Sequence, residues 1–141
     1  IKKTKKRFDL KKQIDIISKL DFSLTKDQNK TLDEINKDLC SEKKMFRLLQ
    51  GDVGSGKTIV SLLSAFNTIN SGFQVAVMAP TEILARQHFL LAKKTFPKNI
   101  EIELISGKWH LLPKIVFTYS CVLANSTVAS MYSLIPGNLL K

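Results

Sequence analysis

Gly51-Asp52-Val53-Gly54-Ser55-Gly56-Lys57-Thr58 is a complete phosphate-binding loop of the form G-x-x-x-x-G-K-[ST]. Its glycines allow consecutive backbone N–H groups to turn toward phosphate oxygens, and the helix that follows directs the positive end of its dipole at them. Lys57 adds a positive charge and Thr58 a hydroxyl that can hold Mg²⁺, so these two are the candidate catalytic residues and Thr58 is the candidate metal ligand. The loop predicts that the chain binds a nucleoside triphosphate through all eight residues.

The segments on either side of the loop fit a strand and a helix. Residues 45–50, Met45-Phe46-Arg47-Leu48-Leu49-Gln50, form a short, mostly apolar run typical of a buried parallel strand. Residues 59–70 carry apolar side chains at helical spacing, namely Ile59, Leu62, Leu63, Phe66 and Ile69. Gly72 fits the position just after the end of that helix. This is the context in which such a loop binds phosphate.

The alternation of strand and helix then repeats. Residues 74–79 predict a second strand, and Thr81 predicts the N-cap of a helix that runs to about Phe96. Residues 100–105 predict a third strand. The pattern indicates an α/β fold of the P-loop NTPase class, with a parallel sheet and flanking helices.

Acidic residues in the third predicted strand are not a catalytic pair in our interpretation. Glu101 and Glu103 alternate with isoleucines and therefore lie on one face of the strand. We interpret that face as solvated.

Length and charge limit the remaining possibilities. The chain has 141 residues, 44% of them hydrophobic, which is enough for one domain with its own core, and because it begins at Ile1 we expect it to be a piece of a longer chain. Its net charge is +10, and residues 1–20 hold eight Lys and Arg against two Asp. A basic arm of this kind favours binding to a polyanion. For a protein with a phosphate-binding loop, we expect that partner to be nucleic acid and not a membrane surface. The alternative is a solvated linker whose lysines keep it soluble.

The cysteines and histidines of the chain are isolated from one another. Cys40 and Cys121 form no C-x-x-C pair, and neither His88 nor His110 belongs to a cluster, so we expect reduced thiols and no zinc. The N-terminus lacks the apolar stretch of a signal peptide, which predicts a cytoplasmic location.

Two helices are predicted upstream of the loop. Residues 9–20 place four apolar side chains on one helical stripe, Leu10, Ile14, Ile17 and Leu20. Thr25-Lys26-Asp27-Gln28 is a capping-box pattern, and it opens a helix with three inward positions, Leu32, Ile35 and Leu39. From these residues alone, Gln28 is the partner of Thr25 in that box.

Three stretches together resemble the RecG branch-migrating DNA helicase family. They are Phe22-x-Leu24-Thr25-x-x-Gln28, then Leu49-Gln50 with the phosphate-binding loop, then Ala79-Pro80-Thr81-Glu82-Ile83-Leu84-Ala85-x-Gln87-His88. In that order they resemble the family's Q motif, motif I and motif Ia, in the first RecA-like motor lobe of superfamily 2. The resemblance covers residues 5–107. Ser55 and Glu82 favour this family over the transcription-repair coupling factors, which usually carry a bulky residue and a second Thr there.

The resemblance implies ATP and Mg²⁺ as cofactors and branched DNA, such as replication forks and Holliday junctions, as the partner. It implies that Gln28 contacts the adenine edge, with Phe22 or Leu24 beside the base. It places the following residues on the DNA-tracking surface: Pro80, Thr81, Gln87 and, through a weaker match to a motif that is usually Thr-Gly, Ser106 and Gly107. Residues 1–21 would be a basic linker and helix, and residues 22–107 a partial, incomplete lobe. The wedge domain and the second motor lobe are missing from this chain.

Residues 108–141 depart from the family pattern. All twelve Asp and Glu lie at or before Glu103, whereas a helicase of this family needs an Asp-Glu-x-His box after Gly107 to hold Mg²⁺ and position water. We therefore expect this piece alone to be inactive. The uncharged composition predicts foreign sequence, for example an out-of-frame reading or a truncated gene.

The residues of this tail allow two alternatives to foreign sequence. Residues 114–119 fit a β-strand added to the sheet edge. Residues 115–135 are uncharged, but seven Ser, Thr and Asn interrupt them, so a membrane span is disfavoured.

Two function classes remain open at this point. In the first, the chain is the ATP-binding part of a DNA helicase that remodels branched DNA in recombination and repair. In the second, it is a non-catalytic nucleotide- or DNA-binding module, because the acidic hydrolysis motif is absent. GTPases and small-molecule kinases fit worse, because the chain has neither Asn-Lys-x-Asp after the loop nor lid arginines, Arg86 being the only arginine there.

Overall fold

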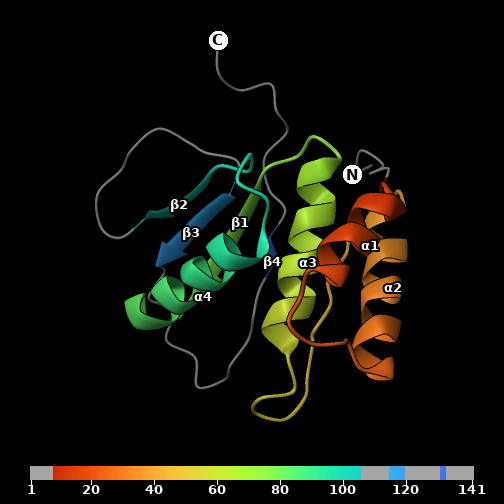
Figure 1. The fold of residues 1–141 in the computed structure, drawn as a ribbon, viewed down its shortest axis with the longest axis horizontal. Helices are drawn as coiled ribbons and strands as arrows, with labels where there is room; N and C mark the ends of the chain where they lie inside the picture. Colours follow the sequence, from red (N-terminus) through yellow and green to blue (C-terminus); the bar gives the residue numbers. More distant parts are fainter. Residues whose placement is uncertain (1–7, 106–114, 120–130, 133–141) are drawn as a thin grey trace. The chain divides into compact units, whose positions relative to one another are not determined.

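The chain divides into two units, Ile1–Gly72 and Phe73–Lys141; in their described residues the first has three helices and the phosphate-binding loop, and the second has a sheet and one helix (Figure 1). The computed structural model describes residues 8–105, 115–119 and 131–132.

The first helix, α1 (Leu10–Ser18), begins at its N-cap Asp9, whose carboxylate accepts from the Lys11 backbone N–H at 3.0 Å. The helix is as predicted, but the face it buries is different. It buries Gln13 and Ile16, whereas Leu10 and Ile14 of the predicted stripe are 62% and 66% exposed. The reason is that the Gln13 carboxamide oxygen accepts hydrogen bonds from two other helices, which offset the desolvation cost of burying it.

The second helix, α2 (Lys26–Cys40), confirms the capping box. The Thr25 hydroxyl accepts from the Gln28 N–H at 3.2 Å, and the Gln28 carboxamide oxygen accepts from the Thr25 N–H at 2.9 Å. Both donors would otherwise lack a partner at a helix start. The three predicted inward residues, Leu32, Ile35 and Leu39, are buried.

The third helix, α3 (Lys57–Asn70), follows the loop directly, and its five predicted apolar positions are all buried. It ends at the predicted glycine: Gly72 has φ +84° and donates to the Ile69 carbonyl at 2.8 Å. Glycine adopts this left-handed backbone conformation at little energetic cost, because it has no Cβ.

Three buried amides join the helices of this unit. The Gln13 carboxamide oxygen accepts from Asn36 Nδ2 at 3.0 Å and from Asn67 Nδ2 at 2.8 Å, and Asn67 Nδ2 also donates to Asn36 Oδ1 at 2.9 Å. These side chains are 8%, 8% and 2% exposed. Because the network supplies a partner to each of these groups, it fixes how α1, α2 and α3 register against one another.

The strand predicted over residues 45–50 is wrong. The structure assigns residues 44–50 to neither helix nor strand, and Phe46 and Leu48 are 86% and 67% exposed. An apolar run becomes a strand only when a neighbouring strand satisfies its backbone groups, and composition does not supply that neighbour.

The second unit is built on a four-stranded sheet. Its strands are β1 (Val75–Ala79), β2 (Ile102–Ile105), β3 (Ile115–Tyr119) and β4 (Met131–Tyr132), in the spatial order β2-β3-β1-β4. β3 pairs in parallel with β1 and with β2, and β4 pairs antiparallel with β1. The predicted second and third strands and the parallel pairing are confirmed, with one antiparallel strand added.

The tail strand is an interior strand and not an edge strand. Ile115 is in register with Val75 on one side and with Ile102 on the other. The sheet therefore uses residues 115–119 as the link between β1 and β2, which do not pair with each other. The foreign origin of residues 108–141 stays a prediction, and Ser106 and Gly107 lie outside the described residues.

Helix α4 (Glu82–Thr95) connects β1 to β2 and begins as predicted, with the Thr81 hydroxyl accepting from the Leu84 N–H at 3.3 Å. It buries Ala85 and Ala92. In the strand after it, Ile102 is buried while both neighbouring glutamates are exposed, which confirms the solvated strand face. Within the described part of the chain, no helix has the length and apolar character to cross a membrane.

Candidate nucleotide-binding site

The phosphate-binding loop turns through two left-handed glycines. Gly54 and Gly56 have φ of +83° and +78°, a region that residues with a Cβ rarely adopt. A Cβ at Gly51 would lie 2.9 Å from Ser55 Oγ, and a Cβ at Gly56 would overlap the Gln28 carboxamide. Backbone conformation therefore favours glycine at positions 54 and 56, whereas the contact at Gly51 is with the end of a side chain that can rotate away.

The Lys57 ammonium lies inside the curve of the loop. Its Nζ donates to the Gly51 carbonyl at 2.8 Å and to the Asp52 carbonyl at 2.6 Å, and it lies 3.3 Å from Ser55 Oγ. The charge is thereby held where the backbone turns. An anion bound in this curve meets the ammonium and the N-terminal end of α3 together.

Gln28 joins the start of α2 to the loop. Its Nε2 donates to the Ser55 carbonyl at 2.9 Å while its Oε1 completes the capping box. The structure thus confirms the capping role that the sequence indicated and adds a contact with the loop. The adenine contact implied by the family resemblance stays a prediction.

The remaining predicted cofactor residues lie around this centre. Thr58 follows Lys57 in the first turn of α3 and is half-buried, while Asp52 and Val53 are exposed at the turn of the loop. Phe22 lies between α1 and α2 and is 51% exposed.

The cradle fits a triphosphate with Mg²⁺. Left-handed glycines, a lysine ammonium and a threonine hydroxyl stand together at a helix N-terminus, and Mg²⁺ is commonly held by one or two protein oxygens plus substrate phosphates. Among the described residues, no group of three or more His, Cys, Asp or Glu could hold a metal ion by itself.

All five predicted DNA-contacting residues fall in the second unit, and the structure describes three of them. Pro80, Thr81 and Gln87 are exposed at the start of α4 and along its first two turns. Thr81 uses its hydroxyl oxygen as the N-cap acceptor, which leaves the hydroxyl hydrogen for a phosphate oxygen.

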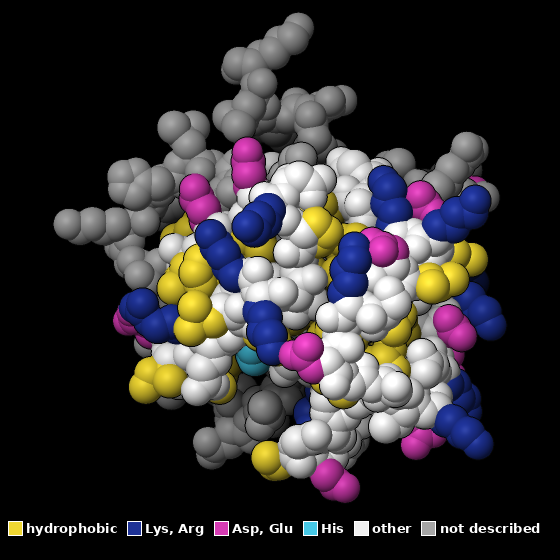
Figure 2. All heavy atoms as spheres, in the orientation of Figure 1, with side chains coloured by type: hydrophobic (Ala, Val, Ile, Leu, Met, Phe, Trp, Pro, Cys, Tyr) yellow, Lys and Arg dark blue, Asp and Glu magenta, His cyan; other side chains and the backbone are white. Residues whose placement is uncertain are grey.

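Charges of both signs are interspersed on the face shown in Figure 2, where lysine and arginine side chains alternate with carboxylates. Residues 1–7, which carry Lys2, Lys3, Lys5, Lys6 and Arg7, lie outside the described residues. The polyanion-binding role of the basic arm stays a prediction.

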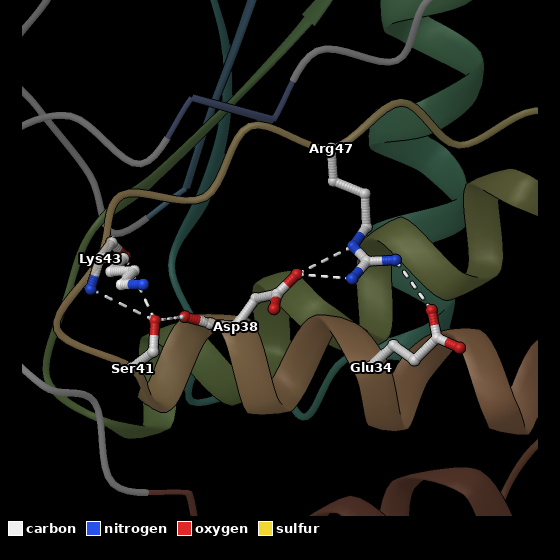
Figure 3. Close-up of polar contacts among 5 residues, drawn as sticks. All are labelled: Glu34, Asp38, Ser41, Lys43 and Arg47. Carbon is white, nitrogen blue, oxygen red and sulfur yellow. Dashed lines mark hydrogen bonds and ion pairs between the residues drawn. The ribbon is translucent and has the colours of Figure 1, made fainter.

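One cluster near the loop was not predicted from the sequence. Arg47, four residues before Gly51, contacts Asp38 and Glu34 of α2 (Figure 3). The hydrogen bond to Asp38 is the largest of the effects that raise the pKa of Arg47. The only signal in the sequence was an arginine inside an otherwise apolar run, together with two acidic residues four positions apart.

Comparison with known proteins places this site in a family. Residues 25–125 match the family described as DEAD/DEAH box helicase. The chain is 55% identical over 93 residues to the ATP-dependent DNA helicase RecG of Borreliella burgdorferi, covering 65% of this chain and 14% of that protein. It is 46% identical over 103 residues to the ATP-dependent DNA helicase RecG of Thermotoga maritima, covering 72% of this chain and 13% of that one.

A solved structure supports the same assignment. The structure of RecG bound to a three-way DNA junction aligns with a TM-score of 0.75 and 36% identity, over 84% of this chain and 18% of that chain. The chain therefore spans less than a fifth of the length of each of these three proteins.

Proposed function

Because the chain belongs to the DEAD/DEAH box helicase family, we propose that it is the ATP-binding part of a RecG-type helicase that remodels branched DNA. The observation that carries the proposal is the geometry of the loop, in which Lys57 lies within hydrogen-bond distance of two loop carbonyls at the start of α3. The names of the relatives and the DNA junction in the aligned structure support the same function.

In this proposal, the triphosphate binds along residues 51–58. Backbone N–H groups of the loop and of the first turn of α3 donate to phosphate oxygens, and Lys57 turns its ammonium from the loop carbonyls to those oxygens. Thr58 supplies the protein oxygen for Mg²⁺, which neutralises phosphate charge when it is bound. Gln28 and Phe22 lie on the base side of the loop in this proposal.

DNA binds elsewhere in the proposal, at the start of α4. Thr81 and the N-terminal end of the helix hold a backbone phosphate, and Pro80 and Gln87 extend this contact. Ser106 and Gly107 continue it along the chain. Contacts of this kind position the strand and do not read its sequence.

The non-catalytic alternative is not favoured by the helicase relatives. Turnover by this chain alone is a separate question, because residues 104–141 contain no carboxylate that could position a hydrolytic water. We expect binding without appreciable hydrolysis.

Calorimetry with MgATP on chain 1–141 tests the proposed function. Lys57→Ala removes a charge-assisted contact, typically worth about 1.5–3 kcal/mol, so the Kd should rise about 10- to 100-fold. Lys30→Ala is the matched control, because Lys30 is an exposed lysine of the same unit. Equal affinity in the Lys57→Ala variant and the parent chain would refute the assignment of the loop.

A further inference from the structure

The arginine that precedes the loop binds two carboxylates of one helix. Arg47 Nε and Nη2 donate to Asp38 Oδ2 at 3.0 Å and 2.6 Å, and Nη1 donates to Glu34 Oε2 at 2.8 Å. Figure 3 shows the guanidinium lying between the two acids, with α2 beneath it. Three of its N–H donors are therefore used in one planar fork, an arrangement that lysine cannot reproduce.

Glu34 and Asp38 form a pair that α2 by itself does not favour. They lie four residues apart, on one face of the helix, where two like charges repel. The guanidinium of Arg47 lies within ion-pair distance of both carboxylates and offsets this repulsion.

The chain turns back sharply to bring Arg47 to this place. At the end of α2, the Ser41 hydroxyl donates to the Asp38 carbonyl at 2.7 Å and accepts from the Lys43 N–H at 3.3 Å (Figure 3). Residues 44–50, which form neither helix nor strand, then bring Arg47 back to α2. In the sequence, Arg47 follows Asp38 by nine residues and Glu34 by thirteen, so these contacts are not local to one helical turn.

The same helix holds the loop at a second point. Gln28, at the start of α2, donates to the Ser55 carbonyl. The loop is therefore tied to α2 in its middle by Gln28 and ahead of its first glycine by Arg47. Between these ties lie Gly51 and Gly54, which leave the backbone free to adopt many conformations.

We propose that Arg47 is a positioning residue of the nucleotide site, which anchors the entry to the phosphate-binding loop on Glu34 and Asp38 of α2. The predicted effect of Arg47 on MgATP affinity rests on the proposed function. Its predicted effect on the backbone of the loop rests on the geometry alone. Arg47 does not contact the triphosphate. It acts by limiting where Gly51 and Asp52 lie, and these two supply the carbonyls that hold Lys57.

The expected effect is moderate. The three side chains are 30%, 43% and 41% exposed, so water and salt screen the ion pairs. Forked geometry and a network of three charges add to what a single exposed pair contributes. We expect a loss of about three- to tenfold in MgATP affinity when the fork is removed, and a smaller loss at high salt.

The test uses chain 1–141 with four single substitutions, Arg47→Gln, Arg47→Lys, Asp38→Asn and Arg86→Gln, and with the double variant Arg47→Gln/Asp38→Asn. Arg86→Gln is the matched control: it removes an exposed arginine whose Nη2 lies 3.0 Å from Glu82 Oε1 on α4. Affinity for MgATP and hydrogen exchange of the peptide covering residues 48–56 are both measured at a temperature where circular dichroism shows each variant folded. A merely structural role would move the melting temperature and leave both readouts unchanged at that temperature.

Arg47→Gln and Asp38→Asn should each weaken MgATP binding and speed exchange over residues 48–56 severalfold. The double variant should lose little more than Arg47→Gln alone, because that substitution already removes the contacts with both acids. Arg47→Lys should restore neither readout fully, and Arg86→Gln should match the parent chain. Unchanged exchange in Arg47→Gln, or complete rescue by Lys, would overturn the proposal.

The two readouts separate this inference from the proposed function. If the parent chain does not bind MgATP, or if Lys57→Ala binds it as well as the parent, the proposed function fails. The exchange measurement still decides whether Arg47 restrains the loop, because it needs no nucleotide.

Discussion

Asn67 is the residue whose replacement tests the packing of the first unit most directly. Its Nδ2 donates to Gln13 Oε1 at 2.8 Å and to Asn36 Oδ1 at 2.9 Å, and its side chain is 2% exposed. Replacement by Ala removes both bonds, each with a net contribution of about 0.5–1.5 kcal/mol. It also leaves Asn36 Oδ1 buried with no donor from Asn67, and a small void where the carboxamide was.

The expected sum is a destabilisation of about 2–4 kcal/mol, after the higher helix propensity of Ala offsets about half a kcal/mol. The melting temperature should fall by roughly 10 °C. Asn29→Ala is the matched control, because the Asn29 Nδ2 also donates twice, to the Leu24 carbonyl at 3.3 Å and the Thr25 carbonyl at 3.1 Å, but on an exposed face. Water can replace those bonds, so the control should lose less than about 1 kcal/mol.

Urea unfolding followed by far-ultraviolet circular dichroism measures both variants, since the helices dominate that signal. The comparison isolates burial, because the residue type, the helical context and the number of donated bonds are the same. If both variants lost the same free energy of unfolding, the buried amides would not be what fixes the three helices, and the reasoning would be wrong.

Two further predictions concern the second unit. Truncation after Gly107 removes β3, which pairs with both β1 and β2, so the melting temperature should fall by about 10 °C or more; an unchanged melting curve for the fragment would favour the foreign-tail hypothesis instead. Burial lowers the pKa of His88 on α4 below its usual 6.5. The unfolded chain then binds the proton more tightly, so stability is full above pH 6.5 and decreases below it. Thermal melts at pH 7.5 and 5.5 should show a smaller pH dependence for His88→Gln, and an equal dependence in both chains would contradict the assignment.

Much of the site follows from local sequence. The glycines at 54 and 56 are left-handed because only glycine adopts that conformation without strain, and the spacing to Lys57 already specifies the loop. The capping box and the buried positions of α2 and α3 follow from side chains a few residues apart. Such features are predictable because each interaction closes within one or two helical turns.

Contacts between distant residues decided the rest. Helical periodicity indicated the stripe of Leu10 and Ile14, yet α1 buries Gln13, because Asn36 and Asn67 offer it hydrogen bonds from 23 and 54 residues away. An apolar run indicated a strand before the loop, where the structure has a segment that is neither helix nor strand and in which Arg47 contacts α2.

The sequence by itself predicted the phosphate-binding loop, the four helices and the strands β1 and β2. Only the tertiary structure decided which face of α1 is buried, which helix anchors the loop, and that Ile115–Tyr119 lies between β1 and β2. The physical reason is the range of the forces: backbone conformation and capping are set by neighbours in the chain, whereas burial of an amide, an ion pair or a strand depends on which distant groups meet it.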